Sequence, residues 1–245
     1  MKLLLTNDDG IQSEGILALA RRLSVKHEVL VVAPSFNQSA KGHSATFHEI
    51  SYTDRGKEGG AHCYALDGTP SDCTRFAIGF LGFRPDLVIS GINDGMNIAY
   101  DVWLSGTVGA AMEANFFSIP SLAVSVYYNR NRDKKDFTFT YALDYIESRL
   151  DFLYDMIKGK SVTLNVNVPM KKWLGERICP LADSIYTALY EKKEDKLNVQ
   201  LWQDLTPERF YGTDIYYVEK GYVSITPLNI NPTDRELIAT WNKTT

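Results

Sequence analysis

The sequence predicts an α/β protein in which helices cover both faces of a mostly parallel sheet, followed by a C-terminal extension of β-hairpins and a helix. From residue 1 to about 170, short apolar runs alternate with segments of helical period. The connections between these runs are long enough for helical crossovers, which join parallel strands. After Met170 the pattern changes to polar and apolar residues in alternation, which is typical of antiparallel strands. We therefore expect a three-layer core over 1–170 and an extension over 171–245.

Composition bounds the class of protein. The chain has 245 residues, of which 44% are hydrophobic and 23% charged, as in ordinary globular proteins. Its net charge of −4 argues against binding to long nucleic acids, but allows a small phosphorylated ligand. No apolar run approaches the ~18 residues of a membrane span, and the first apolar run is too short for a signal peptide. We expect a cytoplasmic protein with no membrane contact.

The first elements form a β-α-β unit. The apolar run Lys2–Thr6 ends abruptly in Asn-Asp-Asp-Gly, which predicts a strand buried on both faces. Ser13 can cap the following helix, in which apolar residues recur at helical spacing through Leu23. Glu28–Ala33 reads as a second buried strand, stopped by Pro34. The two strands should be parallel neighbours.

The middle of the chain repeats this alternation after a polar loop over residues 34–45. Strands are expected at Thr46–Tyr52 and His62–Leu66, around a charged tip at Asp54–Gly60. Thr69-Pro70 places a capping residue and a proline at the start of a helix that runs to Phe80. Further strands are expected at Asp86–Ser90, Ser121–Val126 and Ser161–Asn167, and further helices at Ser105–Phe117 and Phe137–Ile157.

The extension is rich in aromatic side chains. Strands are expected at Ile185–Glu191, Leu197–Trp202, Asp214–Val218 and Tyr222–Thr226, and a helix at Pro232–Trp241. The aromatic residues here are Tyr186, Tyr190, Trp202, Tyr211, Tyr216, Tyr217 and Tyr222. So much aromatic surface favours burial against a second subunit, with a small subdomain folded back on its own core as the alternative.

Oxygen-bearing side chains follow several predicted strands at their carboxyl ends, where open α/β sheets bind ligands. Asp8 and Asp9 are adjacent carboxylates that a bound cation would compensate, although a helix cap beside a solvated neighbour gives the same pattern. Ser39 and Asn93, with Asn97 nearby, should reach the same crevice. These are hard oxygen donors, which favour Mg²⁺, Mn²⁺ or Ca²⁺ over zinc.

Two further segments are candidates for phosphate contacts. Ser105-Gly106-Thr107 begins a helix, where free amide groups bind anions, but plain helix capping explains it equally well. His43 is either a solvated surface residue or a general acid or phosphate contact. The dinucleotide glycine fingerprint is missing after the first strand, which excludes a dinucleotide oxidoreductase. The three cysteines show no CxxC spacing.

A series of motifs then resembles one family. The matching segments are Thr6–Gly10, Ala33-Pro34, Gln38-Ser39, Gly42–Ser44, Leu66–Cys73, Pro85–Asn93, Ser105–Ala111, Asn165–Pro169 and Gly221–Leu228. In this order they resemble the SurE family of survival proteins, which act as 5′-nucleotidases. The resemblance implies a Rossmann-like core, a C-terminal extension that exchanges between subunits, and a homodimer or homotetramer. Ala40, Ala99 and Leu104 depart from the family pattern, which bears on loop geometry and substrate preference.

The resemblance implies a metal-dependent phosphomonoesterase that hydrolyses nucleoside 5′-monophosphates, with 3′-nucleotides and short polyphosphates as further substrates. The expected ligands of one divalent cation per subunit, Mg²⁺ or Mn²⁺ with Ca²⁺ able to occupy the site, are Asp8, Asp9, Ser39 and Asn93. The expected catalytic residues are Asp8, Asp9, Ser105 and Thr107. The expected substrate-binding residues are Asn7, Ser39, His43, Asn97, Ser105, Gly106 and Thr107. A metal-dependent nucleotide sensor without turnover is the alternative function.

Overall fold

The computed structural model describes residues 1–128, 137–183, 187–202 and 207–242, without the side chains of residues 187–189 and 199–202. In chain order the strands are β1 (Lys2–Thr6), β2 (Glu28–Pro34), β3 (Tyr52–Glu58), β4 (Ala61–Leu66), β5 (Leu87–Asn93), β6 (Ser121–Tyr127), β7 (Thr163–Pro169), β8 (Glu176–Ile178), β9 (Thr187–Lys193), β10 (Lys196–Trp202) and β11 (Val223–Leu228). The helices are α1 (Glu14–Leu23), α2 (Pro70–Arg75), α3 (Asp101–Leu104), α4 (Gly106–Phe116), α6 (Thr140–Ile157), α7 (Asp214–Glu219) and α8 (Arg235–Trp241). Two short helical turns lie at Phe76–Phe80 and Pro207–Phe210.

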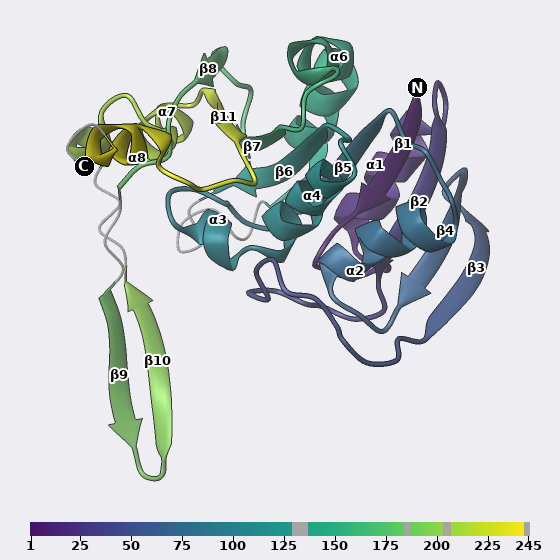
Figure 1. Cartoon of the computed structure of the whole chain (residues 1–245), viewed down its shortest axis with the longest axis horizontal. Coiled ribbons are helices and arrows are strands. Elements are labelled where there is room, and N and C mark those ends of the chain that lie inside the picture. The colour runs from purple at the N-terminus through teal and green to yellow at the C-terminus, as the bar shows by residue number, and fades with distance from the viewer. Residues whose placement is uncertain (129–136, 184–186, 203–206, 243–245) are drawn as a thin grey trace.

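The described strands form a nine-stranded sheet in the order β3-β4-β2-β1-β5-β6-β7-β11-β8, with β9 and β10 paired separately. From β4 to β7 all neighbours are parallel. β3 and β11 pair antiparallel with β4 and β7 respectively. Helices α1 and α6 cover one face of the sheet and α2 and α4 the other (Figure 1). The expected three-layer, mostly parallel α/β fold is therefore confirmed.

Alternation along the buried strands divides the core into two layers. Leu3 and Leu5 of β1 pack in the cluster shared with α1 and α6, whereas Leu4 packs in the cluster shared with α2. Successive side chains of a strand point to opposite faces, so an uninterrupted apolar run is what a strand covered on both faces requires. The buried strand at Lys2–Thr6 thereby places the residues that follow it, Asp8 and Asp9 among them, at the carboxyl end of the sheet.

Three element predictions are wrong. The strand expected at Thr46–Tyr52 begins only at Tyr52, and the charged tip itself forms most of β3, an exposed edge strand where charged side chains are tolerated. Asp214–Val218 is the helix α7 instead of a strand, because its buried residues Asp214, Ile215 and Val218 follow helical spacing. Tyr222–Thr226 corresponds to β11, which joins the central sheet instead of forming a hairpin.

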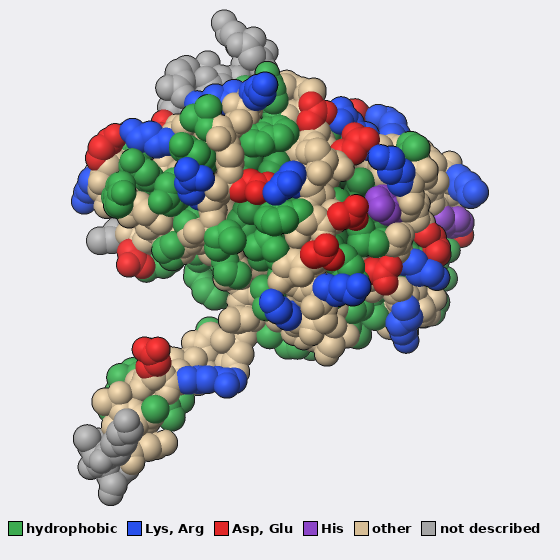
Figure 2. Space-filling model, turned by 90° about the horizontal axis from the view of Figure 1, so that it is seen from above, with side chains coloured by type: hydrophobic (Ala, Val, Ile, Leu, Met, Phe, Trp, Pro, Cys, Tyr) green, Lys and Arg blue, Asp and Glu red, His purple; other side chains and the backbone are tan. Residues whose placement is uncertain are grey.

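The pair β9 and β10 forms an antiparallel hairpin that stands away from the body of the molecule (Figures 1 and 2). Its register pairs Lys196 with Lys193 next to the turn and Trp202 with Thr187 at its base. The prediction of strands at 185–191 and 197–202 is confirmed for the described residues, and Ile185 and Tyr186 lie outside them. In the part of the chain that the structure describes, no helix is long and apolar enough to cross a membrane.

Candidate functional site

The sheet has a topological switch point between β1 and β5. From β1 the chain proceeds to β2 and β4 on one side, and then returns to β5 on the other side of β1. At such a point the connections leave the sheet in opposite directions and open a crevice at the carboxyl ends of the strands. Asp8 and Asp9 directly follow β1, and Asn93 is the last residue of β5. The fold therefore brings these three predicted residues to one place.

A cleft of about 220 Å³ lies at this edge. Five of the predicted site residues line it: Asp8, Ser39, Asn93, Asn97 and Ser105. The other described residues of its wall are Ala40, Asp94, Met96, Asp101 and Leu104. These residues come from the ends of β1 and β5, from the connection after β2, and from the short helix α3 and the start of α4.

Asp8 is the buried acid of the cleft. Its residue surface is 4% exposed, and the hydroxyl of Thr107 donates a hydrogen bond of 2.5 Å to its Oδ1. Burial raises the pKa of the Asp8 carboxyl, and this effect outweighs the bonds from Thr107 and the neighbouring backbone, which lower the pKa. A carboxylate that is poorly solvated in this way is stabilised by a cation at its open side.

The start of α4 lies directly against Asp8. A Cβ atom on Gly106 would come within 2.8 Å of the Asp8 Cβ and 3.0 Å of the Pro70 Cγ, so only glycine allows this approach. The Ser105 hydroxyl accepts a hydrogen bond of 3.1 Å from the Val108 amide, as a helix cap does. The capping interpretation thus holds for Ser105, while its place in the cleft wall leaves the predicted phosphate contact open.

Asp9 connects the end of β1 to the end of β5. Its Oδ2 accepts a hydrogen bond of 3.3 Å from the backbone amide of Asp94. The Asn93 side chain donates through its nitrogen to the Gly95 carbonyl at 2.8 Å, which leaves its oxygen for a ligand. The hydroxyl of Tyr128, the residue directly after β6, donates to the Asp94 carboxylate at 2.7 Å and holds the same loop.

A buried layer of amide side chains supports Asn97. Its side-chain nitrogen Nδ2 donates to the Ser125 hydroxyl at 2.8 Å. Its backbone carbonyl accepts from the side-chain nitrogens of Asn165 at 2.7 Å and Asn167 at 3.0 Å. Two residues further on, the Ala99 amide donates to the buried carboxylate of Asp214 at 2.8 Å. The segment that lines the cleft is therefore fixed both to the sheet and to the residues after 170.

Four predicted substrate-binding residues do not line the cleft, namely Asn7, His43, Gly106 and Thr107, and neither does the predicted metal ligand Asp9. Asn7 is fully buried, and its side chain bridges the amide and the carbonyl of Gly10, which closes the turn that presents Asp8 and Asp9. His43 donates from Nε2 to Glu113 at 2.7 Å. Their direct contact with substrate stays a prediction.

Sequence reasoning missed Asp94 and Asp101, which also line the cleft. Asp94 follows Asn93 directly, so its place in the loop was a usable signal. Asp101 belongs to the four-residue helix α3, whose length leaves no periodic pattern in the sequence. The buried Glu113 was also missed, because its partners Arg75 and His43 lie 38 and 70 residues away.

The cleft fits a hard divalent cation. Within the described residues no group of three or more His, Cys, Asp or Glu side chains is arranged to hold a metal, so the set depends on Ser39 and Asn93 joining the two aspartates. All four side chains offer oxygen, and the wall that the structure describes contains no cysteine or histidine. Oxygen donors of this kind suit Mg²⁺, Mn²⁺ or Ca²⁺.

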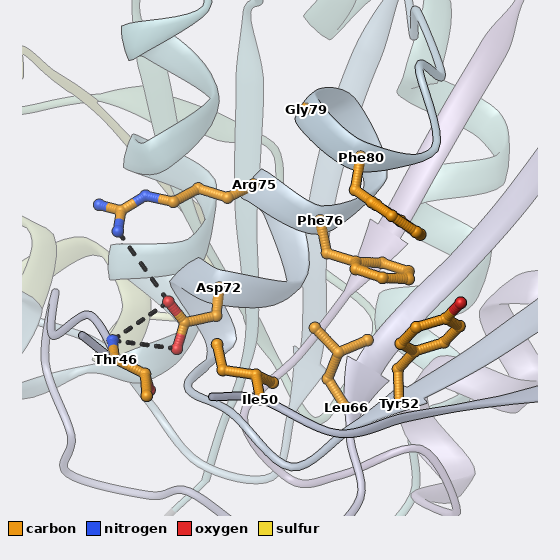
Figure 3. Close-up of a pocket in the computed structure, with 9 residues that line it drawn as sticks. All are labelled: Thr46, Ile50, Tyr52, Leu66, Asp72, Arg75, Phe76, Gly79 and Phe80. Carbon is orange, nitrogen blue, oxygen red and sulfur yellow. Dashed lines mark hydrogen bonds and ion pairs between the residues drawn. The ribbon is translucent and has the colours of Figure 1, made fainter. Parts of the chain in front are cut away.

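A second, larger hollow of about 590 Å³ lies along α2 (Figure 3). Its wall includes Ile50 and the rings of Tyr52, Phe76 and Phe80, with Arg75 at one end. Phe76 lies 4.9 Å from Tyr52 and 5.0 Å from Phe80 between ring centroids, so these rings pack against one another. This hollow contains none of the predicted site residues.

Fold and cleft together define a Rossmann-like α/β protein with an oxygen-lined ligand site at the switch point of its sheet. The family model of the survival protein SurE matches residues 3–188. The chain therefore belongs to the SurE family, which confirms the resemblance seen in its motifs.

Relatives support this assignment over nearly the full chain. A protein from Clostridium botulinum named 5′-nucleotidase SurE is 36% identical over 246 residues, covering 97% of this chain and 96% of the relative. A protein of the same name from Clostridium beijerinckii is 35% identical, with 98% and 97% covered. The crystal structure of the SurE protein from Aquifex aeolicus is similar with a TM-score of 0.81 and 29% identity, covering 100% of this chain and 99% of that one.

Proposed function

We propose that this protein is a metal-dependent phosphomonoesterase that hydrolyses nucleoside 5′-monophosphates to a nucleoside and phosphate. The observation that carries the proposal is the convergence of Asp8, Ser39, Asn93 and Ser105 on one cleft. This cleft lies at the switch point of a chain whose relatives are named 5′-nucleotidases.

The proposed ligands of one divalent cation are Asp8, Asp9, Ser39 and Asn93, with Mg²⁺ or Mn²⁺ as the working metal and Ca²⁺ able to occupy the site. Burial of Asp8 supports this assignment, because the raised pKa of its carboxyl marks a charge that needs a cation. When bound, the ion supplies Lewis-acid chemistry to a phosphate ester. Orientation of the phosphate ester and stabilisation of its developing charge are proposed for the protein's own side chains.

Thr107 and the start of α4 are proposed to orient the reacting groups. The Thr107 hydroxyl holds the Asp8 carboxylate at Oδ1, which fixes the direction of the second oxygen. Gly106 allows the helix start to approach Asp8, where the Gly106 and Thr107 amides donate to the Asp8 carboxylate. The Ser105 hydroxyl lines the cleft beside it. From this position the Ser105 hydroxyl is proposed to donate to a transferred phosphoryl group and to stabilise the charge that develops on it.

Asn97 is proposed to contact the substrate from the opposite wall, where Ser125, Asn165 and Asn167 fix its position. We keep Asn7 and His43 as proposed contributors to substrate binding. Asn7 closes the turn that carries the two aspartates, and His43 belongs to the connection that carries Ser39. Hydrolysis of 3′-nucleotides and of short polyphosphates belongs to the same proposal.

Phosphate release from a panel of substrates tests the activity. The panel comprises the four 5′-ribonucleotides, 3′-AMP and tripolyphosphate, each with Mg²⁺, with Mn²⁺ and with EDTA. We expect steady turnover of at least one 5′-nucleotide that chelation abolishes and added metal restores. Thr107→Ala should lower kcat by about tenfold, whereas Thr107→Ser keeps the hydroxyl and most of the rate. Turnover that persists after exhaustive chelation would remove the metal from the proposal.

A nucleotide sensor without turnover is the competing function for the same cleft. It predicts metal-dependent binding of AMP in calorimetry with no phosphate released over hours. The buried acid and the helix start beside it favour the enzyme, because binding alone does not require a carboxylate held in this environment.

We further propose a cytoplasmic homodimer or homotetramer assembled through residues after 170. Large apolar side chains are exposed on the hairpin and on α8: Tyr190, Leu197, Leu237, Ile238 and Trp241. Exposed patches of this kind usually mark contacts between proteins. Light scattering at micromolar concentration checks the assembly, and a monomer would show that the extension needs no partner.

A further inference from the structure

The segment that carries Ser39 lies over the cleft as a loop of residues 38–44, called here the Ser39 loop. Two backbone hydrogen bonds fix it at its ends, from the Gln38 amide to the Asp8 carbonyl at 2.7 Å and from the Gly42 amide to the Leu104 carbonyl at 2.9 Å. Ser39 itself is exposed. Its position over the cleft therefore depends on what holds the loop.

The Ser39 loop is strained between these two bonds. Ala40 has a φ of 60°, in the left-handed region, where a residue with a Cβ costs about 1–2 kcal/mol relative to the right-handed region. Strained residues of this kind persist only where surrounding contacts over-determine them. The contacts that do so are found on α4.

Helix α4 receives the Ser39 loop at a glycine. A Cβ atom on Gly109 would lie 2.7 Å from the Gly42 carbonyl oxygen and 2.8 Å from the His43 Cα. Both neighbours are backbone atoms, so the loop backbone rests directly on the helix with no room for a side chain. One turn further along α4 is Glu113, which is 2% exposed.

Glu113 joins the loop to two helices. Its carboxylate accepts a bond of 2.7 Å from the His43 Nε2 and two bonds from Arg75, from Nε at 2.5 Å and from Nη2 at 3.0 Å. Burial raises the pKa of the Glu113 carboxyl, but the bonds from His43 and Arg75 outweigh it, so the pKa is lowered and the carboxylate is charged. Such paired, charge-assisted hydrogen bonds are among the strongest that side chains make.

The same network reaches the chain just beyond the loop. Arg75 lies 3.9 Å from Asp72, and the Asp72 carboxylate accepts from the Thr46 amide at 3.2 Å (Figure 3). The backbone on both sides of Ser44 is therefore tied to α2 or α4. His48, four residues after the Ser39 loop, is exposed and takes no part in the hydrogen bonds described above.

We propose that Glu113 and His43 are positioning residues of the proposed nucleotidase site. The Glu113 carboxylate, held by Arg75, accepts the hydrogen bond from His43 and so keeps Ser39 over the cleft. This inference rests on the function proposed above. Glu113 lies seven residues after Gly106, about 10 Å along the helix axis. It therefore acts on the cleft through the loop and not by touching the substrate.

The test compares His43→Ala and Glu113→Gln with His48→Ala as the matched control. The first readout is free of metal and substrate: deuterium uptake of a peptide covering 38–44, and trypsin cleavage after the exposed Lys41. We expect both rates to rise about tenfold in the two network variants and to stay at the wild-type level in the control. His43→Gln, whose amide can still donate to Glu113, should restore part of the protection.

The second readout is the Mn²⁺ concentration that gives half-maximal hydrolysis of AMP. Loss of groups that orient a metal ligand typically costs about 10–100-fold in affinity or activity. We expect the metal requirement to rise within that range, by a larger factor than kcat falls. The double variant His43→Ala/Glu113→Gln should cost less than the sum of the two single changes, because both act on the same contact between His43 and Glu113.

Wild-type protection of residues 38–44 in both variants would overturn the proposal, whether or not the protein hydrolyses nucleotides. Faster exchange with an unchanged metal requirement would also overturn it, since the contact would then be structural only. Faster exchange in a protein with no phosphatase activity would reject the proposed function and the positioning role for it, while leaving the loop contact in place. If Glu113→Gln does not fold, His43→Ala decides alone, because the His43 side chain is 29% exposed.

Discussion

The wall of the cleft formed by β1 and the start of α4 is buried, whereas the wall formed by the Ser39 loop is exposed. Asp8 on the first wall is fixed by its place at the end of β1, by a direct hydrogen bond from Thr107 and by the close approach of Gly106. Ser39 on the second wall depends on a strained loop and on side chains two turns further along α4. Changes on the first wall should therefore remove the chemistry itself, and changes on the second should weaken binding.

The largest effect is expected at the buried acid. Asp8→Asn keeps the volume of the side chain but removes its charge, so activity on AMP should fall by at least about two orders of magnitude. Asp155→Asn, on the exposed side of α6, is the matched control and should leave activity unchanged. A variant at position 8 with wild-type kinetics would show that the buried wall does not carry the reaction.

Gly106→Ala should have the next largest effect. The added methyl group would meet the Asp8 Cβ at 2.8 Å, so either the acid or the helix start must shift. A displacement of about 1 Å in a catalytic group can lower the reaction rate about 100-fold. We therefore expect kcat to fall by about 10–100-fold while the fold is retained. Gly79→Ala, where an added Cβ meets nothing within 4 Å, is the control. Equal kinetics in the two variants would contradict the close approach.

Burial of Asp8 also makes a prediction for stability. Because its pKa is raised in the folded protein, its contribution to stability is fully present below the unfolded value of 3.8 and is lost as the pH rises through the folded value. In EDTA at neutral pH, Asp8→Asn should therefore raise the Tm by a few degrees. This difference should shrink as the pH falls towards 3.8. An Asp8→Asn protein that melts below the wild type at every pH would contradict the assignment.

The smallest effect is expected on the exposed wall. Ala40→Gly relieves the left-handed strain of about 1–2 kcal/mol, but the freer unfolded chain offsets about 0.4–1 kcal/mol of it. A net gain of at most about 1.6 kcal/mol in the free energy of unfolding should remain. Ala18→Gly in α1 is a control of opposite sign, with an expected loss of about 1 kcal/mol. Denaturant titration of both variants measures the difference.

The sequence predicted what depends on local pattern. The strand at Lys2–Thr6 has the expected bounds, and the cap at Thr69 with Pro70 forms as a full capping box. The error at Asp214–Val218 arose because five residues are too few to separate the periods of strand and helix. The edge strand β3 was misplaced because its exposed, charged residues carry no apolar signal.

The candidate site divides in the same way. Asp8, Asp9 and Asn93 were predictable because they stand at the ends of recognisable strands. The hydrogen bond between Glu113 and His43 joins residues that are 70 apart in the chain. Only the packing of α4 against the Ser39 loop reveals this contact. Long-range polar contacts of this kind follow from the fold and leave no mark on local sequence.

Direct titration of Mn²⁺ tests the central claim, that the two walls meet around one divalent cation. Electron paramagnetic resonance of free Mn²⁺ should report one site per chain in the wild type, with binding lost in Asp8→Asn and weakened in His43→Ala. AMP hydrolysis should follow the occupancy of that site. Equal Mn²⁺ binding by the wild type and Asp8→Asn would contradict the account, because the buried acid would then hold no metal.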